Sequence, residues 1–181
     1  MNDIIYSPRS GEEVKRATGN IPIYTYSDLS KKSEKIGSKK VLNEMFNKSL
    51  KNIILLQDPD NMNSGHWFSI SLNPHKHEIY FFSTYGGKPD QEKNRWIDKT
   101  HLTRSQQVVD LFNDGLQQLQ KEGWVIHYND HKYQHEGDHT STCGIYTAAF
   151  LNSNLNPDEF YEQTKLISGN PAVEYYRRYF L

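Results

Sequence analysis

The sequence predicts an α+β fold in which helices enclose a short mixed sheet, and three observations favour it. Residues 52–57 carry the unbroken run Ile-Ile-Leu-Leu, which is typical of a strand covered on both faces. Residues 67–72 and 78–82 indicate two more strands, joined by the turn Asn73-Pro74-His75-Lys76. Helical periodicity lies on either side of this group. At 181 residues, the chain is long enough for one domain with a real core.

Before these strands, residues 30–40 form a charged stretch that we expect to be solvated and to lead into a helix over 41–48. After them, apolar residues at helical intervals predict a helix over 103–121 that ends at Gly123. Residues 124–128 are typical of a further strand. Three helices follow. One begins at Cys143, one covers 157–167 and is capped by Asn156, and the last covers 175–179. The expected organisation is an N-terminal region (1–50), a core (51–151) and C-terminal helices (152–181).

Composition limits the classes of function. The formal net charge of −1 argues against a broad phosphate-binding surface, so no strong nucleic-acid binding is expected. A single cysteine excludes an intrachain disulfide and suits a reducing compartment. The first residues lack a signal-peptide core, and no apolar stretch approaches the roughly 20 residues of a membrane span. We therefore expect a cytoplasmic protein without membrane association.

The single cysteine, Cys143, is the main candidate for chemistry. Polar residues at 140–142 give way abruptly to the apolar run 145–151, which predicts a buried helix with Cys143 in its first turn. A helix N-terminus favours a thiolate over a thiol, so Cys143 is a candidate nucleophile. Free cysteines are also often simply buried, which leaves a structural role as the alternative. The motif Gly65-His66-Trp67 favours chemistry, because a lone cysteine with a distant histidine is a pattern of cysteine proteases.

Four motifs in order resemble the adenovirus-protease (adenain) and Ulp1 clan of cysteine proteases. They are Gly65-His66-Trp67, the segment from Phe81 to Gly86, a glutamine, and the segment from Thr142 to Tyr146. The resemblance covers residues 51–151 and is greater to the adenovirus branch, whose compact members are typical of viruses and virophages. It implies an adenain-like fold with the nucleophile at the start of a buried helix, with Cys143 as nucleophile, His66 as its base and Gln134 as an oxyanion donor.

The mechanism implied is thiolate attack on a peptide carbonyl. His66 shares the Cys143 proton to give a thiolate and imidazolium pair. The Cys143 N–H and the Gln134 side chain stabilise the oxyanion, and Gly144 is expected to let the substrate backbone approach closely. In the clan an acid or amide follows the histidine by 17 residues, and here Ser83 holds that position. Ser83 can accept a hydrogen bond but cannot stabilise an imidazolium by charge. The interval from Gln134 to Cys143 is also longer than usual, which predicts a loop between them.

A histidine series competes with this interpretation. His127, His131, His135 and His139 recur every four residues, a spacing that on one helix would favour a transition metal. The intervening Asn, Asp and Gly residues oppose a continuous helix, so we interpret these histidines as loop residues, and His75 and His77 as turn residues.

The sequence thus predicts a cysteine endopeptidase that processes viral structural or precursor proteins during capsid maturation. The alternatives are a ubiquitin- or SUMO-like deconjugase or a Cys-His acetyltransferase, and a non-catalytic metal-binding module. The expected partner is a protein substrate, and the expected location is the host cytoplasm (viral factory) and the virion. No cofactor is expected, neither DNA nor the disulfide-tethered peptide that assists adenovirus protease, because a second cysteine is absent and the charge is near neutral.

Overall fold

The computed structural model describes residues 2–57, 65–91, 93–94, 110–134 and 140–181. Within these residues a mixed sheet of five strands has the order β1-β2-β3-β4-β5. The strands are β1 (Ile23–Thr25), β2 (Lys51–Gln57), β3 (Gly65–Asn73), β4 (Glu78–Phe82) and β5 (Val125–Tyr128). The outer pairs β1/β2 and β4/β5 are parallel, and the inner pairs are antiparallel. The predicted α+β class, mixed sheet and β3–β4 hairpin are confirmed, whereas β1 was not predicted.

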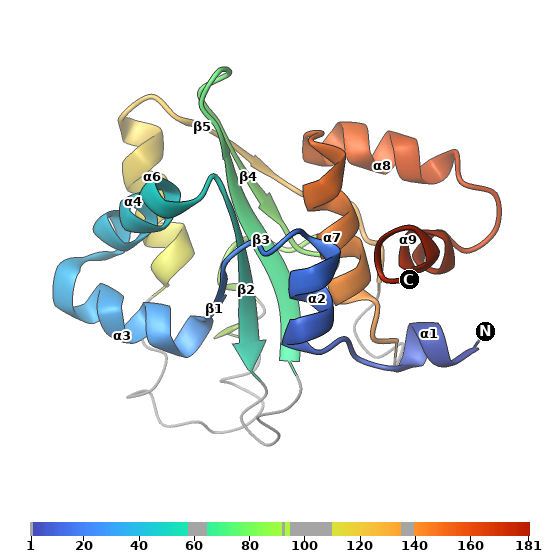
Figure 1. Cartoon of the computed structure of the whole chain (residues 1–181). Coiled ribbons are helices and arrows are strands. Elements are labelled where there is room, and N and C mark those ends of the chain that lie inside the picture. Colours follow the sequence, from blue (N-terminus) through green and yellow to red (C-terminus); the bar gives the residue numbers. More distant parts are fainter. Residues whose placement is uncertain (1, 58–64, 92, 95–109, 135–139) are drawn as a thin grey trace.

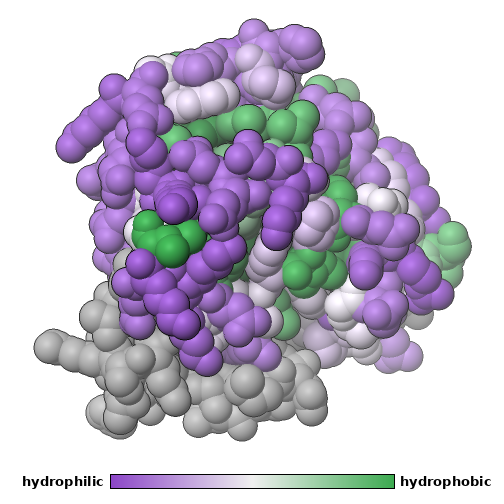
Figure 2. All heavy atoms as spheres, turned by 60° about the vertical axis from the view of Figure 1, so that its left-hand side comes forward, coloured by the Kyte–Doolittle hydropathy of each residue, from purple (hydrophilic) through white to green (hydrophobic). Residues whose placement is uncertain are grey.

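Helices cover both faces of this sheet (Figure 1). The group α3 (Tyr26–Ile36), α4 (Ser38–Lys48) and α6 (Leu111–Lys121) lies on one side. The other side carries α2 (Gly11–Ala17), α7 (Cys143–Ser153), α8 (Pro157–Lys165) and α9 (Pro171–Tyr179). The short helix α1 (Asn2–Tyr6) lies on this side too, in contact with α9. Figure 2 shows the face of α3, α4 and α6 as mostly hydrophilic, with apolar atoms visible in separate areas between polar side chains. These helices therefore turn their apolar sides inward, as amphipathic helices on a sheet do.

Two apolar cores lie on opposite faces of the sheet, and β3 contributes to both. Phe68 and Ile70 pack in the core under α3, α4 and α6. Trp67 packs in the core under α7, α8 and α9. Alternate residues of a strand point to opposite faces, so His66 lies on the face of Phe68 and not on that of Trp67. The ring of His66 indeed stacks against Phe68, with centroids 6.3 Å apart.

The prediction that residues 30–40 are solvated and lead into a helix is confirmed in part. The charged side chains of this stretch are mostly exposed, and α4 follows, but most of the stretch is itself helical and Ser30, Ser33 and Ser38 are buried. The small hydroxyls let two helices approach closely, and Ser33 Oγ lies 2.7 Å from Ser38 Oγ across the junction. Gly37, with φ of 92°, makes the break between the helices. This packing could not be predicted from the sequence, because the buried residues are serines and the stretch shows no apolar periodicity.

The remaining boundaries differ by a few residues. The helix predicted over 103–121 is described from Leu111, and residues 103–109 lie outside the described residues. α8 begins at Pro157 as predicted, with the reciprocal Asn156–Glu159 capping box, but ends at Lys165. α7 is buried from Cys143 to Leu151, as predicted for an apolar helix, and it packs against β3. In the described part of the chain, no helix is long and apolar enough to cross a membrane.

Candidate active site

His66 lies near the start of β3 and is fully enclosed, with 1% of its surface exposed. Its Nε2 is 2.9 Å from Ser83 Oγ, which follows the end of β4. In the antiparallel pairing of β3 with β4, Ser69 faces Phe82, so the residues before Ser69 and those after Phe82 lie at the same end of the two strands. His66 and Ser83 both lie at this end, where the serine hydroxyl can hold the imidazole by a hydrogen bond.

The second ring nitrogen of His66, Nδ1, is buried and has no hydrogen-bond partner among the described residues. The ring of Tyr85 stacks on the imidazole, with centroids 4.5 Å apart and an interplanar angle of 29°. Burial lowers the pKa of His66 to about 3. His66 is therefore a neutral imidazole in this structure, and its Nδ1 is the nitrogen still available for proton transfer.

Cys143 is the first residue of α7 and is 7% exposed. Burial raises the pKa of its thiol, while backbone hydrogen bonds from Trp67, Gly144 and Cys143 itself act in the opposite direction. Because Cys143 begins α7, the N–H groups of the first helical turn favour negative charge on the sulfur once the proton leaves.

Gln134 is held by hydrogen bonds on both ends of its amide. Its Oε1 accepts from Thr84 Oγ1 at 3.0 Å, and its Nε2 donates to the Thr140 carbonyl at 2.9 Å. The side chain is 5% exposed. An amide nitrogen carries two hydrogens, so one N–H of Gln134 is engaged with Thr140 and the second is available to a substrate.

A cavity of about 370 Å³ opens beside Cys143, and Gln134 lies in the same wall region. Its lining also includes Trp67, Tyr85 and the segment from Pro8 to Gly11 before α2. That segment is fixed in place, because Trp67 Nε1 donates to the Arg9 carbonyl at 3.1 Å. The N-terminal region is therefore part of the cavity wall, although the sequence placed the catalytic core at 51–151.

Gly144 does not face this cavity, so the expected room for a substrate there is wrong. A Cβ at Gly144 would lie 3.1 Å from Trp67 Cδ1 and 3.2 Å from Arg9 Cβ. The glycine instead lets the first turn of α7 pack closely on β3 and on the N-terminal segment.

The structure brings the predicted residues together as two pairs. Cys143 and Gln134 share one cavity, and His66 and Ser83 share a hydrogen bond. No hydrogen bond joins His66 to Cys143 in the described part of the chain, and His66 is not among the residues that line the cavity. Tyr85 links the pairs, since it lines the cavity and stacks on the imidazole. Burial lowers the pKa of His66 and raises the pKa of Cys143, and both shifts favour the neutral form of the group.

Three residues that sequence reasoning missed hold the site in place. Thr84 and Tyr85 follow Ser83 directly, and each contacts a different candidate residue. The side-chain amide of Asn129 donates to the Ser83 carbonyl at 2.6 Å and to the His131 carbonyl at 2.9 Å. The polar residues that directly follow the strands at 78–82 and 124–128 were the signal in the sequence for these roles. Their contacts could not be predicted from it, because they depend on the pairing of β4 with β5.

The two described members of the histidine series, His127 and His131, have different partners. His127 lies on β5 beside Glu78, at 3.4 Å, while His131 lies in the following turn beside Asp158. His135 and His139 lie outside the described residues. His77 is a turn residue with φ of 57°, and it stacks on Trp124.

No protein-family model and no curated protein matches the sequence. Among solved structures, the chain is similar to the SUMO protease Ulp1 with its catalytic cysteine oxidised to a sulfonic acid. That match has 14% identity and a TM-score of 0.41, and covers 93% of this chain and 70% of the other. The C-terminal Ulp1 protease domain in complex with Smt3, the yeast orthologue of SUMO, has 15% identity and a TM-score of 0.41, with 93% and 69% covered. Both similarities are weak, and the functional proposal rests on the site itself.

Proposed function

We propose that the protein is a cysteine endopeptidase with Cys143 as its nucleophile. The observation that carries this proposal is the cavity that Cys143 and Gln134 both line: the thiol lies at the start of α7, and the Gln134 amide keeps one N–H beyond the one bonded to Thr140. A carbonyl that enters this cavity meets a nucleophile and oxyanion donors together. Acyl transfer needs that combination.

His66 acts as the base through Nδ1. When Nε2–H donates to Ser83 Oγ, the lone pair of the imidazole lies on Nδ1, the nitrogen without a partner. The thiol proton passes to Nδ1 as sulfur attacks the carbonyl carbon, and the imidazolium then protonates the leaving amine. Water, activated by the same nitrogen, hydrolyses the thioester and regenerates the thiol.

The two pairs must approach each other for this step. Tyr85 lies against the imidazole and in the cavity wall, so a substrate in the cavity would contact a residue that packs on the base. Because burial opposes charge on both groups, proton transfer accompanies attack on the substrate instead of preceding it. The free enzyme is then expected to react slowly with small alkylating agents at neutral pH.

The proposed substrate is a protein, and the sequence motifs favour a viral structural or precursor protein. A proteome-derived peptide library, analysed by mass spectrometry, tests cleavage without a known substrate. Wild-type protein should cleave a defined set of peptides, Cys143→Ala should cleave none, and both should have the same circular dichroism spectrum. Cleavage by folded Cys143→Ala would refute the assignment. Covalent capture of a ubiquitin-like vinyl sulfone by the wild type, without peptide cleavage, would favour a deconjugase.

A further inference from the structure

His131 is held rigidly in the turn that follows β5. Its backbone N–H donates to Asn129 Oδ1 at 3.0 Å, and its carbonyl accepts from the same side chain. Its ring lies flat on Tyr161 of α8, with centroids 3.8 Å apart and planes within 3°. Both the position of the backbone and the direction of the ring are therefore fixed.

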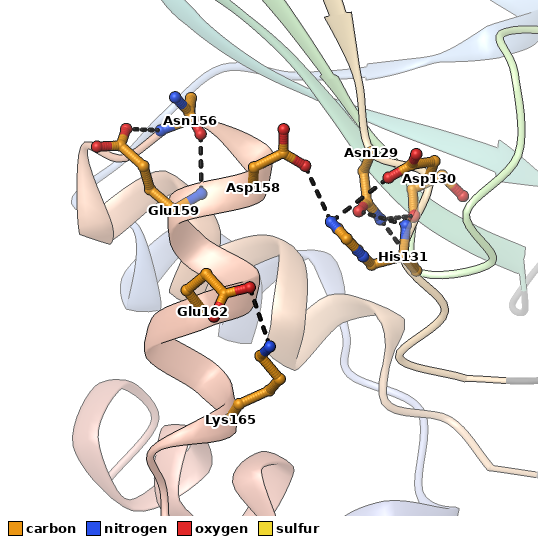
Figure 3. Close-up of polar contacts among 9 residues, drawn as sticks. Asn129, Asp130, His131, Asn156, Asp158, Glu159, Glu162 and Lys165 are labelled. Carbon is orange, nitrogen blue, oxygen red and sulfur yellow. Dashed lines mark hydrogen bonds and ion pairs between the residues drawn. The ribbon is translucent and has the colours of Figure 1, made fainter.

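Two carboxylates face the ring that is fixed in this way. His131 Nε2 is 2.9 Å from Asp158 Oδ1 and 3.4 Å from Asp130 Oδ1 (Figure 3). The three atoms all lie within 4.8 Å of one another. Asp158 and Tyr161 are one helical turn apart on α8, so the same helix face supplies a carboxylate and the ring that orients the imidazole.

These distances suit ligands that share one metal ion. Zinc binds imidazole nitrogen and carboxylate oxygen at about 2.0–2.2 Å, which places neighbouring ligand atoms about 3.0–3.5 Å apart. The separations of 2.9 Å and 3.4 Å need little adjustment to reach that range. With a neutral imidazole the group carries two negative charges close together, and a divalent cation would neutralise them.

We propose that Asp130, His131 and Asp158 bind a divalent transition-metal ion such as zinc. One imidazole and two carboxylates favour zinc, manganese or cobalt, whereas calcium and magnesium prefer all-oxygen ligands. Both carboxylates are largely exposed, so water completes the coordination and the ion exchanges with solvent. The site is separate from Cys143 and does not depend on the proposed protease activity.

The bound ion would act as a clamp between the turn after β5 and α8. Asn129 ties the same turn to the Ser83 carbonyl, and a Cβ at Gly86 would lie 3.0 Å from the Asp130 carbonyl. By holding this turn, the bound ion would stabilise the segment that contains Ser83, the hydrogen-bond partner of His66. Stabilisation of the fold by the metal is the direct consequence.

Isothermal titration of zinc chloride into untagged Cys143→Ser protein tests the site, since that background removes thiol binding. We expect one saturable event and a rise in melting temperature. His131→Phe keeps the stacking on Tyr161 without a ligand atom, and Asp158→Asn keeps the shape without the charge. Even outer-shell changes alter metal affinity by about 10- to 100-fold, so each variant should lose at least about tenfold.

Glu162→Gln is the matched control, because Glu162 lies on the same helix but pairs with Lys165 at 2.9 Å (Figure 3). It should bind zinc like its parent. Cobalt should give a visible absorption band in the parent that both site variants lack, and calcium should not compete. Equal zinc affinity in the parent and both site variants, or no saturable binding in the parent, would overturn the proposal and leave a plain ion pair of His131 with the two carboxylates.

Discussion

Replacing Ser83 by aspartate should turn the proposed dyad into a triad with a charged third member. Ser83 Oγ already lies 2.9 Å from His66 Nε2, so a carboxylate there would contact the same nitrogen. At about 4 Å and an effective dielectric constant of about 20, two unit charges attract by about 4 kcal/mol. Since one pKa unit corresponds to about 1.36 kcal/mol, the carboxylate should raise the His66 pKa by about three units.

The raised pKa of His66 should improve catalysis near neutral pH. Burial holds that pKa at about 3 in the wild type, and a rise of about three units would bring it near 6, close to the optimum for a general base. We expect kcat/KM for a peptide identified in the library screen to increase about tenfold or more. The acid limb of its pH profile should then report the new pKa.

Ser83→Asn separates charge from geometry in this experiment. Its amide oxygen can accept the Nε2–H hydrogen bond but cannot stabilise an imidazolium by charge. NMR titration of the His66 ring should show a higher pKa in Ser83→Asp than in Ser83→Asn and the wild type, with equal thermal unfolding required of all three. If the aspartate and asparagine variants titrate alike, or if folded Ser83→Asp loses activity, the assigned role of Ser83 is wrong.

Three further predictions concern other parts of the molecule. Gln134→Ala should lower kcat by about 10²- to 10³-fold. Thr84→Val removes the 3.0 Å hydrogen bond that orients Gln134, so it should lower kcat less, and Thr84→Ser should restore turnover. An unchanged kcat in folded Thr84→Val would contradict this role of Thr84. The Asp90 pKa is raised to about 6, mainly by burial, so the folded state binds more protons than the unfolded state between about pH 4 and 6. The unfolding free energy should therefore fall by up to about 3 kcal/mol as pH rises through that window, a loss that Asp90→Asn should largely abolish in urea titrations. Adding duplex DNA at physiological salt should not increase turnover, and a large increase would show that the near-neutral charge of the chain was misinterpreted.

The sequence predicted well what depends on local pattern. The apolar run after Cys143 required a buried helix, and Asn156-Pro157 required a helix start, since both signals lie within a few residues. The resemblance to the protease clan placed Ser83 at the position that follows the histidine by 17 residues, and Ser83 Oγ indeed lies 2.9 Å from His66 Nε2. The sequence did not predict contacts that depend on tertiary packing, such as the burial of the serines of α3 and the position of Arg9 in the cavity wall. Neither carries a periodic or compositional signal of its contact partner.

The lack of a hydrogen bond between His66 and Cys143, among the described residues, has a physical cause in β3. Successive residues of a strand point to opposite faces, so Trp67 packs toward α7 and the cysteine while His66 points toward the other core. A base on the far face can reach the thiol only at the end of the sheet, where the strand no longer separates the two faces. His66 is the second residue of β3, at that end, and the next residue, Trp67, packs in the same core as Cys143. The chain thus keeps its proposed base buried, and Tyr85, which stacks on the imidazole and lines the cavity of Cys143, is the residue that contacts both parts of the site.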